Sequence, residues 1–214
     1  MITPINSKQS IVDLICELVK DKDVLDVGCV QHKADNETSA GWLHRHISAA
    51  ARTVLGLDLE EVEVKRLRDK GYNVIHGDAT SIDIGRQFNA IVAGEIIEHI
   101  DNPGLFLNNM RKHLTTDGFL VISTPNVFFP LHFLESVFGS PYKRWNSQHV
   151  QWYCYFTLEN LLKRNGFSVL DCYYTTRSRK ALLLMKLLRL PCYSFFASTL
   201  VVTCRKTATS AEDL

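Results

Sequence analysis

The chain has 214 residues, of which 46% are apolar and 22% charged, with 24 Lys and Arg against 23 Asp and Glu. This length and composition predict one globular domain over residues 1–214, and they exclude the disordered, collagen-like and small disulfide-stapled classes. The net charge of +1 argues against a dedicated nucleic-acid binder, which normally carries a clear basic excess. None of the six cysteines forms a C-x-x-C pair, so the sequence indicates free thiols in a reducing compartment.

Strand-like and helix-like segments alternate along most of the chain. Short apolar runs predict seven strands, at residues 24–27, 53–57, 72–76, 88–93, 119–123, 167–175 and 199–204. Helical spacing predicts helices at 11–18 (capped by Ser7), 42–51, 59–70, 105–114, 157–165 and 182–190. Continuous apolar strands separated by helices are typical of a parallel sheet that is covered on both faces. We therefore expect an α/β fold, a doubly wound, Rossmann-like and mostly parallel seven-stranded sheet with helices on both faces.

The regular alternation stops after Pro125. Residues 126–155 carry nine aromatic side chains without clear periodicity: Phe128, Phe129, Phe133, Phe138, Tyr142, Trp145, Trp152, Tyr153 and Tyr155. A long connection of this kind is usually a lid or a binding loop. The sequence therefore predicts an aromatic lid inserted over a ligand site.

Polar residues stand at the ends of the first four predicted strands. They are Asp26 with Gly28, Asp58, Asp78 and Glu95. In a doubly wound sheet, ligands bind at the carboxyl ends of the strands. The chain has no G-x-G-x-x-G or G-x-x-x-x-G-K motif for a phosphate-rich cofactor. Carboxylates are better suited to a ligand with a cationic amine and sulfonium, a ribose diol and an adenine, which describes S-adenosylmethionine.

Four segments resemble the class I S-adenosylmethionine-dependent methyltransferases. They are VLDVGC at 24–29, GLDLE at 56–60, GDA at 77–79 and FNAIVAGEIIEHIDNP at 88–103. Their order and spacing are similar to the branch that includes the ubiquinone-biosynthesis O-methyltransferases, over residues 11 to about 176.

The resemblance implies roles for the residues of these segments. Gly28 and Cys29 would let the backbone approach the methionine, and Asp58 would accept hydrogen bonds from the ribose hydroxyls. The other implied cofactor-binding residues are Asp78 and Ala79 beside the adenine, Glu95 beside the methionine end, and Asp26 and Leu59 next to these. The alternatives are a surface carboxylate at a helix start for Asp58 and an ordinary turn residue for Asp78.

The first motif departs from the family pattern after Gly28. The chain continues Cys29-Val30-Gln31-His32, where the family has further glycines, and Asp26 and Asp58 are about ten residues farther apart than in the family. The Val30 side chain restricts close backbone approach. Either residues 31–41 supply a different wall for the methionine, or cofactor affinity is modest.

A second group of residues could hold a metal or act as a base. Glu95, Glu98 and His99 are spaced i, i+3 and i+4, so they share a face if the segment is helical. With the downstream His149 they resemble metal-binding small-RNA 2′-O-methyltransferases and metal-dependent quinone O-methyltransferases. The resemblance implies a divalent metal, Mg²⁺, Mn²⁺ or Zn²⁺, on Glu95, Glu98, His99 and His149. Without a metal, His99 and Glu98 would be the catalytic residues, with His99 as general base, or both would belong to the scaffold.

Residues 177–198 form a basic apolar segment. It could be an amphipathic helix at an anionic membrane, a core helix or a dimer face. The chain has no signal peptide and no apolar run long enough to span a membrane, so we expect a cytoplasmic protein, with peripheral contact at the inner membrane face as the alternative.

These observations predict an enzyme that methylates an oxygen atom of a small-molecule, sugar or lipid-linked acceptor. A hydroxyl acceptor needs a base or a metal, which Glu95, Glu98 and His99 can provide. Two alternatives remain: a metal-assisted RNA 2′-O-methyltransferase, disfavoured by the missing basic excess, and a non-catalytic binding module with a degenerate first motif.

Overall fold

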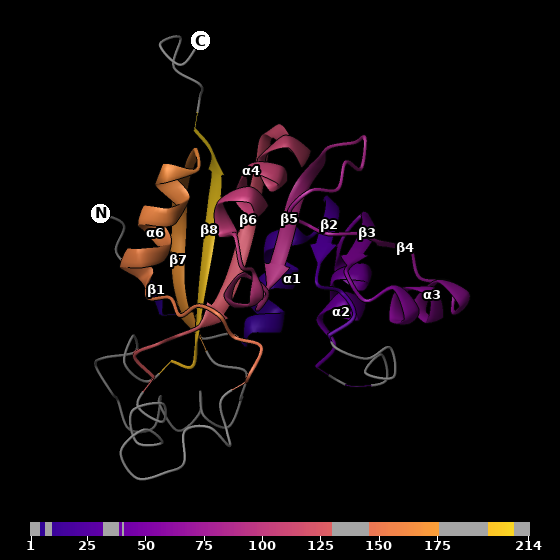
Figure 1. Cartoon of the computed structure of the whole chain (residues 1–214), viewed down its shortest axis with the longest axis horizontal. Helices are drawn as coiled ribbons and strands as arrows, with labels where there is room; N and C mark the ends of the chain where they lie inside the picture. The colour runs from indigo at the N-terminus through magenta and orange to yellow at the C-terminus, as the bar shows by residue number, and fades with distance from the viewer. Residues whose placement is uncertain are drawn as a thin grey trace.

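The computed structural model describes residues 5–6, 10–31, 39, 41–129, 146–175 and 197–207. Within these ranges one sheet of eight strands runs through the molecule in the order β1-β7-β8-β6-β5-β2-β3-β4 (Figure 1). The strands are β1 (Ile5–Asn6), β2 (Asp23–Val27), β3 (Thr53–Asp58), β4 (Val74–His76), β5 (Phe88–Gly94), β6 (Leu114–Pro125), β7 (Phe167–Thr175) and β8 (Thr199–Lys206). The seven predicted strands are confirmed, and the two-residue β1 adds an eighth at the edge.

The sheet is parallel except around β8. The pairs β1–β7, β2–β3, β2–β5, β3–β4 and β5–β6 are parallel, whereas β8 lies antiparallel between β6 and β7. The chain leaves β2 toward β3 and β4, then returns on the other side of β2 to form β5. This reversal is the topological switch point, where doubly wound sheets bind ligands.

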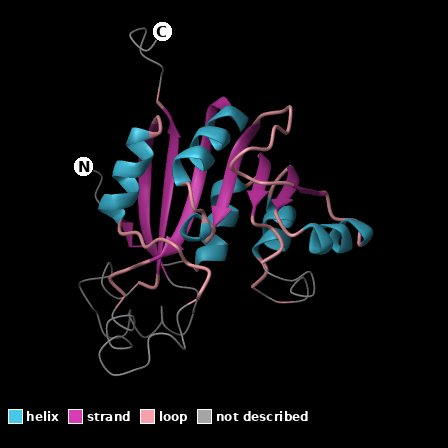
Figure 2. Ribbon diagram, in the orientation of Figure 1, coloured by secondary structure: helices cyan, strands magenta, loops and turns pink. Residues whose placement is uncertain are grey.

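Helices cover both faces of the sheet (Figure 2). They are α1 (Ile11–Val19), α2 (Leu43–Ala50), α3 (Glu61–Asp69), α4 (Pro103–His113) and α6 (Tyr155–Arg164). One core joins α4 and α6 to sheet residues such as Leu25 and Ile91. A second core joins α1 and α2 to Val24 and Val92, the neighbours of those residues in sequence. Successive side chains of a strand point to opposite faces, so both faces of β2 and β5 are buried.

Some details of the predicted elements differ from the structure, and β6 begins at Leu114 instead of residue 119. The cap of α1 is Ser10 and not Ser7, because the Ser10 hydroxyl accepts a hydrogen bond from the Asp13 N–H at 3.3 Å. The strand expected at 72–76 is shorter, because only Val74–His76 pairs with β3. The helix expected at 182–190 lies outside the described residues, as does most of the 177–198 segment.

The predicted aromatic lid is described only at its two ends. Phe133, Phe138, Tyr142 and Trp145 lie outside the described residues. Asn126, at the end of β6, forms a bridge with Tyr153, and Phe128 is 59% exposed beside it. Tyr153 itself is buried in the core of α4 and α6. Both described ends of the 126–155 segment therefore lie beside the carboxyl end of β6. The lid function stays a prediction.

Candidate active site

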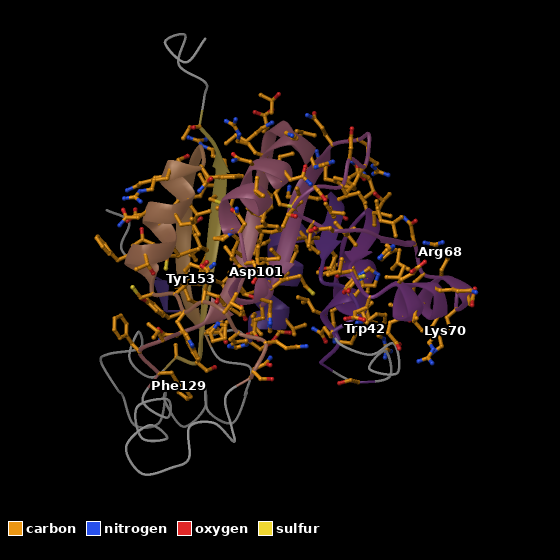
Figure 3. All side chains as sticks on the ribbon, in the orientation of Figure 1. Trp42, Arg68, Lys70, Asp101, Phe129 and Tyr153 are labelled. Atoms are coloured by element: carbon orange, nitrogen blue, oxygen red, sulfur yellow. The ribbon has the colours of Figure 1, made fainter. Side chains whose placement is uncertain are left out.

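The parallel strands bring the expected site residues to one edge of the sheet. β2, β3, β4, β5 and β6 run in the same direction, so their carboxyl ends all lie at the lower edge in Figure 1. Figure 3 shows Trp42 on one side of this edge, near α2, and Tyr153 on the other. The turn after β2 and the segment after β5 lie between them, at the switch point.

The turn after β2 is held tightly against the neighbouring strands. Gly28 has a φ of +79°, and its N–H donates to the Leu57 carbonyl at 2.8 Å. A Cβ at this position would lie 2.8 Å from Cδ1 of Ile96, in the segment after β5. A side chain here would therefore be disfavoured both by the backbone conformation and by the close neighbour.

Asp26 points into the protein. Its Oδ2 lies 2.7 Å from Nδ1 of His44, and both side chains are buried. Burial raises the pKa of the Asp26 carboxyl, and the hydrogen bond from His44 partly opposes this effect. Asp26 is expected at the cofactor site from the sequence, whereas no local pattern points to His44, which follows the 31–41 segment at the start of α2.

Cys29 is buried beneath the turn. Its side chain is 1% exposed, and burial raises the pKa of the thiol. Its carbonyl oxygen accepts a hydrogen bond from the indole N–H of Trp42 at 2.8 Å. Cys29 therefore presents neither its side chain nor its carbonyl to a ligand at this edge.

The carboxylate of Asp58 is oriented by backbone N–H groups on both of its oxygens. Oδ2 accepts from Val30 at 2.9 Å and Oδ1 from Glu60 at 3.1 Å. An ionised carboxylate has about four acceptor positions, so both oxygens can accept further hydrogen bonds. Leu59, the next residue, is 66% exposed and offers an apolar surface beside the carboxylate.

Asp78 lies in a turn after β4. Its Oδ1 accepts from both the N–H and the hydroxyl of Thr80, each at 2.8 Å. The following Ala79 is only 8% exposed, and its carbonyl accepts from the Asn109 amide at 3.1 Å. These contacts fit the turn role that was the alternative for Asp78.

The helix expected to align Glu95 with Glu98 and His99 is absent, and this part of the prediction is wrong. Glu95 has a φ of +51°, and its N–H donates to the Ser123 carbonyl of β6 at 2.9 Å. Only a single 3₁₀ turn, η2 (Ile97–His99), follows before α4 begins. The left-handed residue changes the chain direction at the end of β5, so the i, i+3, i+4 geometry does not apply.

Glu98, His99 and His149 nevertheless come together. One potential ligand atom from each of them lies within 4.8 Å of the others, and Glu95 is not part of this group. Glu98 is 1% exposed, whereas both histidines are partly exposed. The ring centroids of His99 and His149 are 4.7 Å apart, and the centroids of the His149 and Trp152 rings are 5.5 Å apart.

Backbone hydrogen bonds hold the His149 segment over η2. The N–H groups of Val150 and Gln151 both donate to the Glu98 carbonyl, at 2.9 and 3.2 Å. Nδ1 of His99 lies 3.1 Å from the Gln148 carbonyl oxygen. Burial raises the pKa of Tyr153 to about 12, and the nearby Glu98 charge contributes. One carboxylate and two imidazoles form a donor set suited to Zn²⁺ or a similar divalent ion, and an imidazole is also a general base.

No helix in the described ranges is long and apolar enough to cross a membrane. Five of the cysteines, Cys16, Cys29, Cys154, Cys172 and Cys204, are free thiols, and Cys192 lies outside these ranges.

Comparison with known proteins gives consistent matches. A family model described as a methyltransferase domain matches residues 8–171. The chain is 28% identical over 148 residues to a ubiquinone biosynthesis O-methyltransferase of Bradyrhizobium diazoefficiens, covering 65% of this chain and 54% of the relative. It is 26% identical over 113 residues to (S)-tetrahydroprotoberberine N-methyltransferase of Eschscholzia californica, covering 51% of this chain and 32% of the relative. The chain thus spans between about a third and about half of the length of these curated relatives.

Solved structures share the fold at low sequence identity. An S-adenosylmethionine-dependent methyltransferase from Archaeoglobus fulgidus is 15% identical, with a TM-score of 0.61 and coverage of 91% of this chain and 94% of that chain. The 1,6-didemethyltoxoflavin-N1-methyltransferase of Burkholderia thailandensis, solved with bound 1,6-didemethyltoxoflavin and S-adenosylhomocysteine, is 19% identical. Its TM-score is 0.58, with coverage of 92% of this chain and 77% of that chain.

Proposed function

Because the chain belongs to the methyltransferase domain family, with the class I S-adenosylmethionine-dependent fold, we propose that it methylates a hydroxyl oxygen of a small-molecule, sugar or lipid-linked acceptor. The relatives include both O- and N-methyltransferases. The observation that favours oxygen is the group of Glu98, His99 and His149 beside the end of β5. A neutral amine can attack a methyl group directly, whereas a hydroxyl needs help in losing its proton.

The methyl donor, S-adenosylmethionine, would lie along the carboxyl ends of β2, β3 and β5. Asp58 would accept from the ribose hydroxyls, because backbone N–H groups already orient its two oxygens. Gly28, Leu59 and Glu95 would line the donor, and Asp78 with Ala79 would border the adenine. The resemblance of the four sequence segments supports these roles.

In the transfer, the acceptor oxygen forms a bond to the methyl carbon and the bond between carbon and sulfur breaks. S-Adenosylhomocysteine is released, and the hydroxyl proton passes to His99. Glu98 lies within the same group and would stabilise the imidazolium that forms. The protein supplies mainly alignment of the two reactants and a place for this proton.

The three side chains could also bind a divalent metal, and we propose metal-assisted methyl transfer as the more specific form of this function. Glu98, His99 and His149 would hold it, because a buried carboxylate and two imidazoles lie within bonding reach of one ion. A bound metal would lower the pKa of a coordinated hydroxyl and so take over the task of a base.

The test is methyl transfer from isotopically labelled S-adenosylmethionine to matched pairs of acceptors. We suggest phenols, sugars and polyprenyl-linked sugars, each beside the corresponding amine. Labelled product is expected from a hydroxyl compound and not from its amine partner. Transfer confined to amines would overturn the oxygen assignment, and binding of S-adenosylhomocysteine without transfer to any acceptor would favour the non-catalytic module.

Variants connect the activity to the site. Glu98→Gln and His99→Ala are each expected to lower kcat by about a hundredfold or more, the usual contribution of a positioned acid or base. His113→Asn is the control, because His113 is also buried but lies at the far end of α4. Activity that survives both site variants would show that the group does not take part.

A further inference from the structure

Two side chains at the start of α2 contact the end of β2 and the turn that follows it from inside the protein. The indole N–H of Trp42 donates to the Cys29 carbonyl at 2.8 Å, and Nδ1 of His44 lies 2.7 Å from Oδ2 of Asp26. All four residues are buried. Trp42 and His44 follow the 31–41 segment in sequence.

The neighbouring strand makes room for the His44 ring and the Cys29 thiol. A Cβ at Gly56, in the middle of β3, would lie 2.9 Å from Cε1 of His44 and 2.7 Å from Sγ of Cys29. Tyr72 packs edge-on against Trp42, with ring centroids 5.0 Å apart. The imidazole and the indole therefore fill a defined space and have little freedom to move.

A third hydrogen bond connects this turn to the donor site. The N–H of Val30 donates to Oδ2 of Asp58 at 2.9 Å. A displacement of Cys29 would move the adjacent Val30 N–H and, with it, the Asp58 carboxylate. The contacts thus run from the start of α2, through the turn, to the end of β3.

We propose that Trp42 and His44 are positioning residues of the donor site. They hold the Gly28–Val30 turn and the Asp58 carboxylate in place. In this turn the family pattern has further glycines after Gly28. Asp26 takes part through His44 and does not touch the donor. This inference rests on the proposed placement of S-adenosylmethionine at Asp58.

The direct test is calorimetric titration of the full chain with S-adenosylhomocysteine. Trp42→Phe keeps an aromatic ring beside Tyr72 and removes the indole N–H together with the five-membered ring that carries it. It is expected to weaken binding by about fivefold or more, because the Cys29 carbonyl loses its buried donor. His44→Leu leaves the buried Asp26 carboxyl without that hydrogen bond and is expected to weaken binding by about tenfold or more.

His44→Asn is the conservative variant, because the amide N–H can donate to Asp26 from nearly the same position as Nδ1. It should recover most of the affinity that His44→Leu loses. In turnover assays the KM for S-adenosylmethionine should rise in Trp42→Phe and His44→Leu, while the KM for the acceptor stays near that of the parent.

His113→Leu is the matched control for loss of stability. His113 is 3% exposed, and its two ring nitrogens lie 2.9 Å from the Asn109 carbonyl and 3.0 Å from the Ile84 N–H. α4 runs antiparallel to β5 and ends where β6 begins, so His113 lies at the opposite edge of the sheet. This variant should lower the Tm without changing the Kd for S-adenosylhomocysteine.

The inference is overturned if the Trp42 and His44 variants bind S-adenosylhomocysteine like the parent, or if His113→Leu weakens binding as much as they do. If His44→Leu does not fold, Trp42→Phe and His44→Asn carry the test, and parental affinity in Trp42→Phe overturns the inference. Asp58→Ala separates the two proposals. If Asp58→Ala binds S-adenosylhomocysteine weakly while the Trp42 and His44 variants keep the parental affinity, only the positioning role is rejected. If Asp58→Ala also keeps the parental affinity, the donor placement is rejected as well.

Discussion

The imidazole rings of His99 and His149 lie 4.7 Å apart at an angle of 80°, although a whole helix, β6 and the 126–145 segment separate them in sequence. The contact brings a residue from the end of the aromatic segment directly to the end of β5. Glu98 completes the group from within the protein. A site that contains both His99 and His149 is assembled only when the segment before α6 is folded against η2.

We predict that Asp58→Ala cripples donor binding. The variant removes the acceptor of two ribose hydroxyl hydrogen bonds, each worth about 1.5–3 kcal/mol for a charged acceptor. The Kd for S-adenosylhomocysteine should rise at least about tenfold. Glu60→Ala is the control, since the exposed Glu60 contacts Asp58 only through its backbone N–H. An unchanged Kd in a variant that melts like the parent would reject the role of Asp58.

Gly28→Ala should be more harmful than Gly71→Ala. Both glycines have left-handed backbones, with φ of +79° and +90°, so both substitutions introduce strain of about 1 kcal/mol. Only at Gly28 does the new Cβ meet a neighbour, Cδ1 of Ile96 at 2.8 Å, whereas nothing lies within 4 Å at Gly71. Gly28→Ala should therefore lower the Tm further and weaken S-adenosylhomocysteine binding. Equal effects of the two variants on Tm and Kd would contradict this prediction.

Bound metal can be measured without an acceptor, and its effect on turnover can then be measured with one. We expect the purified protein to hold a divalent ion in elemental analysis, and EDTA to remove it and abolish turnover. His149→Ala and Glu98→Gln should reduce the bound metal, whereas Glu95→Gln should retain it, because Glu95 lies outside the group. If EDTA leaves turnover unchanged and no metal is found, the metal proposal fails and His99 as general base remains.

An ion pair far from the site predicts a pH dependence of stability. Arg52 hydrogen-bonds to both oxygens of Asp23, at 3.0 Å through Nε, and holds the pKa of Asp23 at about 2. Because this pKa lies below the usual value near 3.9, the stabilisation is present above about pH 4 and is lost as the pH falls toward 2. Arg52→Ala should lower the Tm at pH 7 by less than about 4 °C, since the pair is exposed.

The Tm difference between parent and Arg52→Ala should shrink as the pH falls from about 4 toward 2. In an Asp23→Asn background the same comparison should show no such change with pH. A difference that stays constant with pH in the parent background would mean that Asp23 is not the titrating group.

The sequence by itself determined the architecture and the donor edge. Five of the six residues in the run 88–93 are apolar, and they fall on both faces of the strand. This pattern is typical of a strand that is buried on both sides. The strand ends follow from where these runs stop, which places Gly28, Asp58 and Glu95 at one edge without any knowledge of tertiary contacts. The seven predicted strands are confirmed for this reason, while the ends of the helices shift by a few residues.

Tertiary structure alone decided which side chains meet. The spacing of Glu95, Glu98 and His99 predicted a shared helical face, but hydrogen bonding of Glu95 to Ser123 in β6 places it in a left-handed conformation instead. His44 gave no signal in the sequence, because its partner Asp26 lies on another element and periodicity reports only on neighbours along one segment. Local patterns depend on interactions a few residues apart, whereas the pairs His44–Asp26 and His99–His149 depend on contacts that form only when β2, α2, η2 and the segment before α6 pack together.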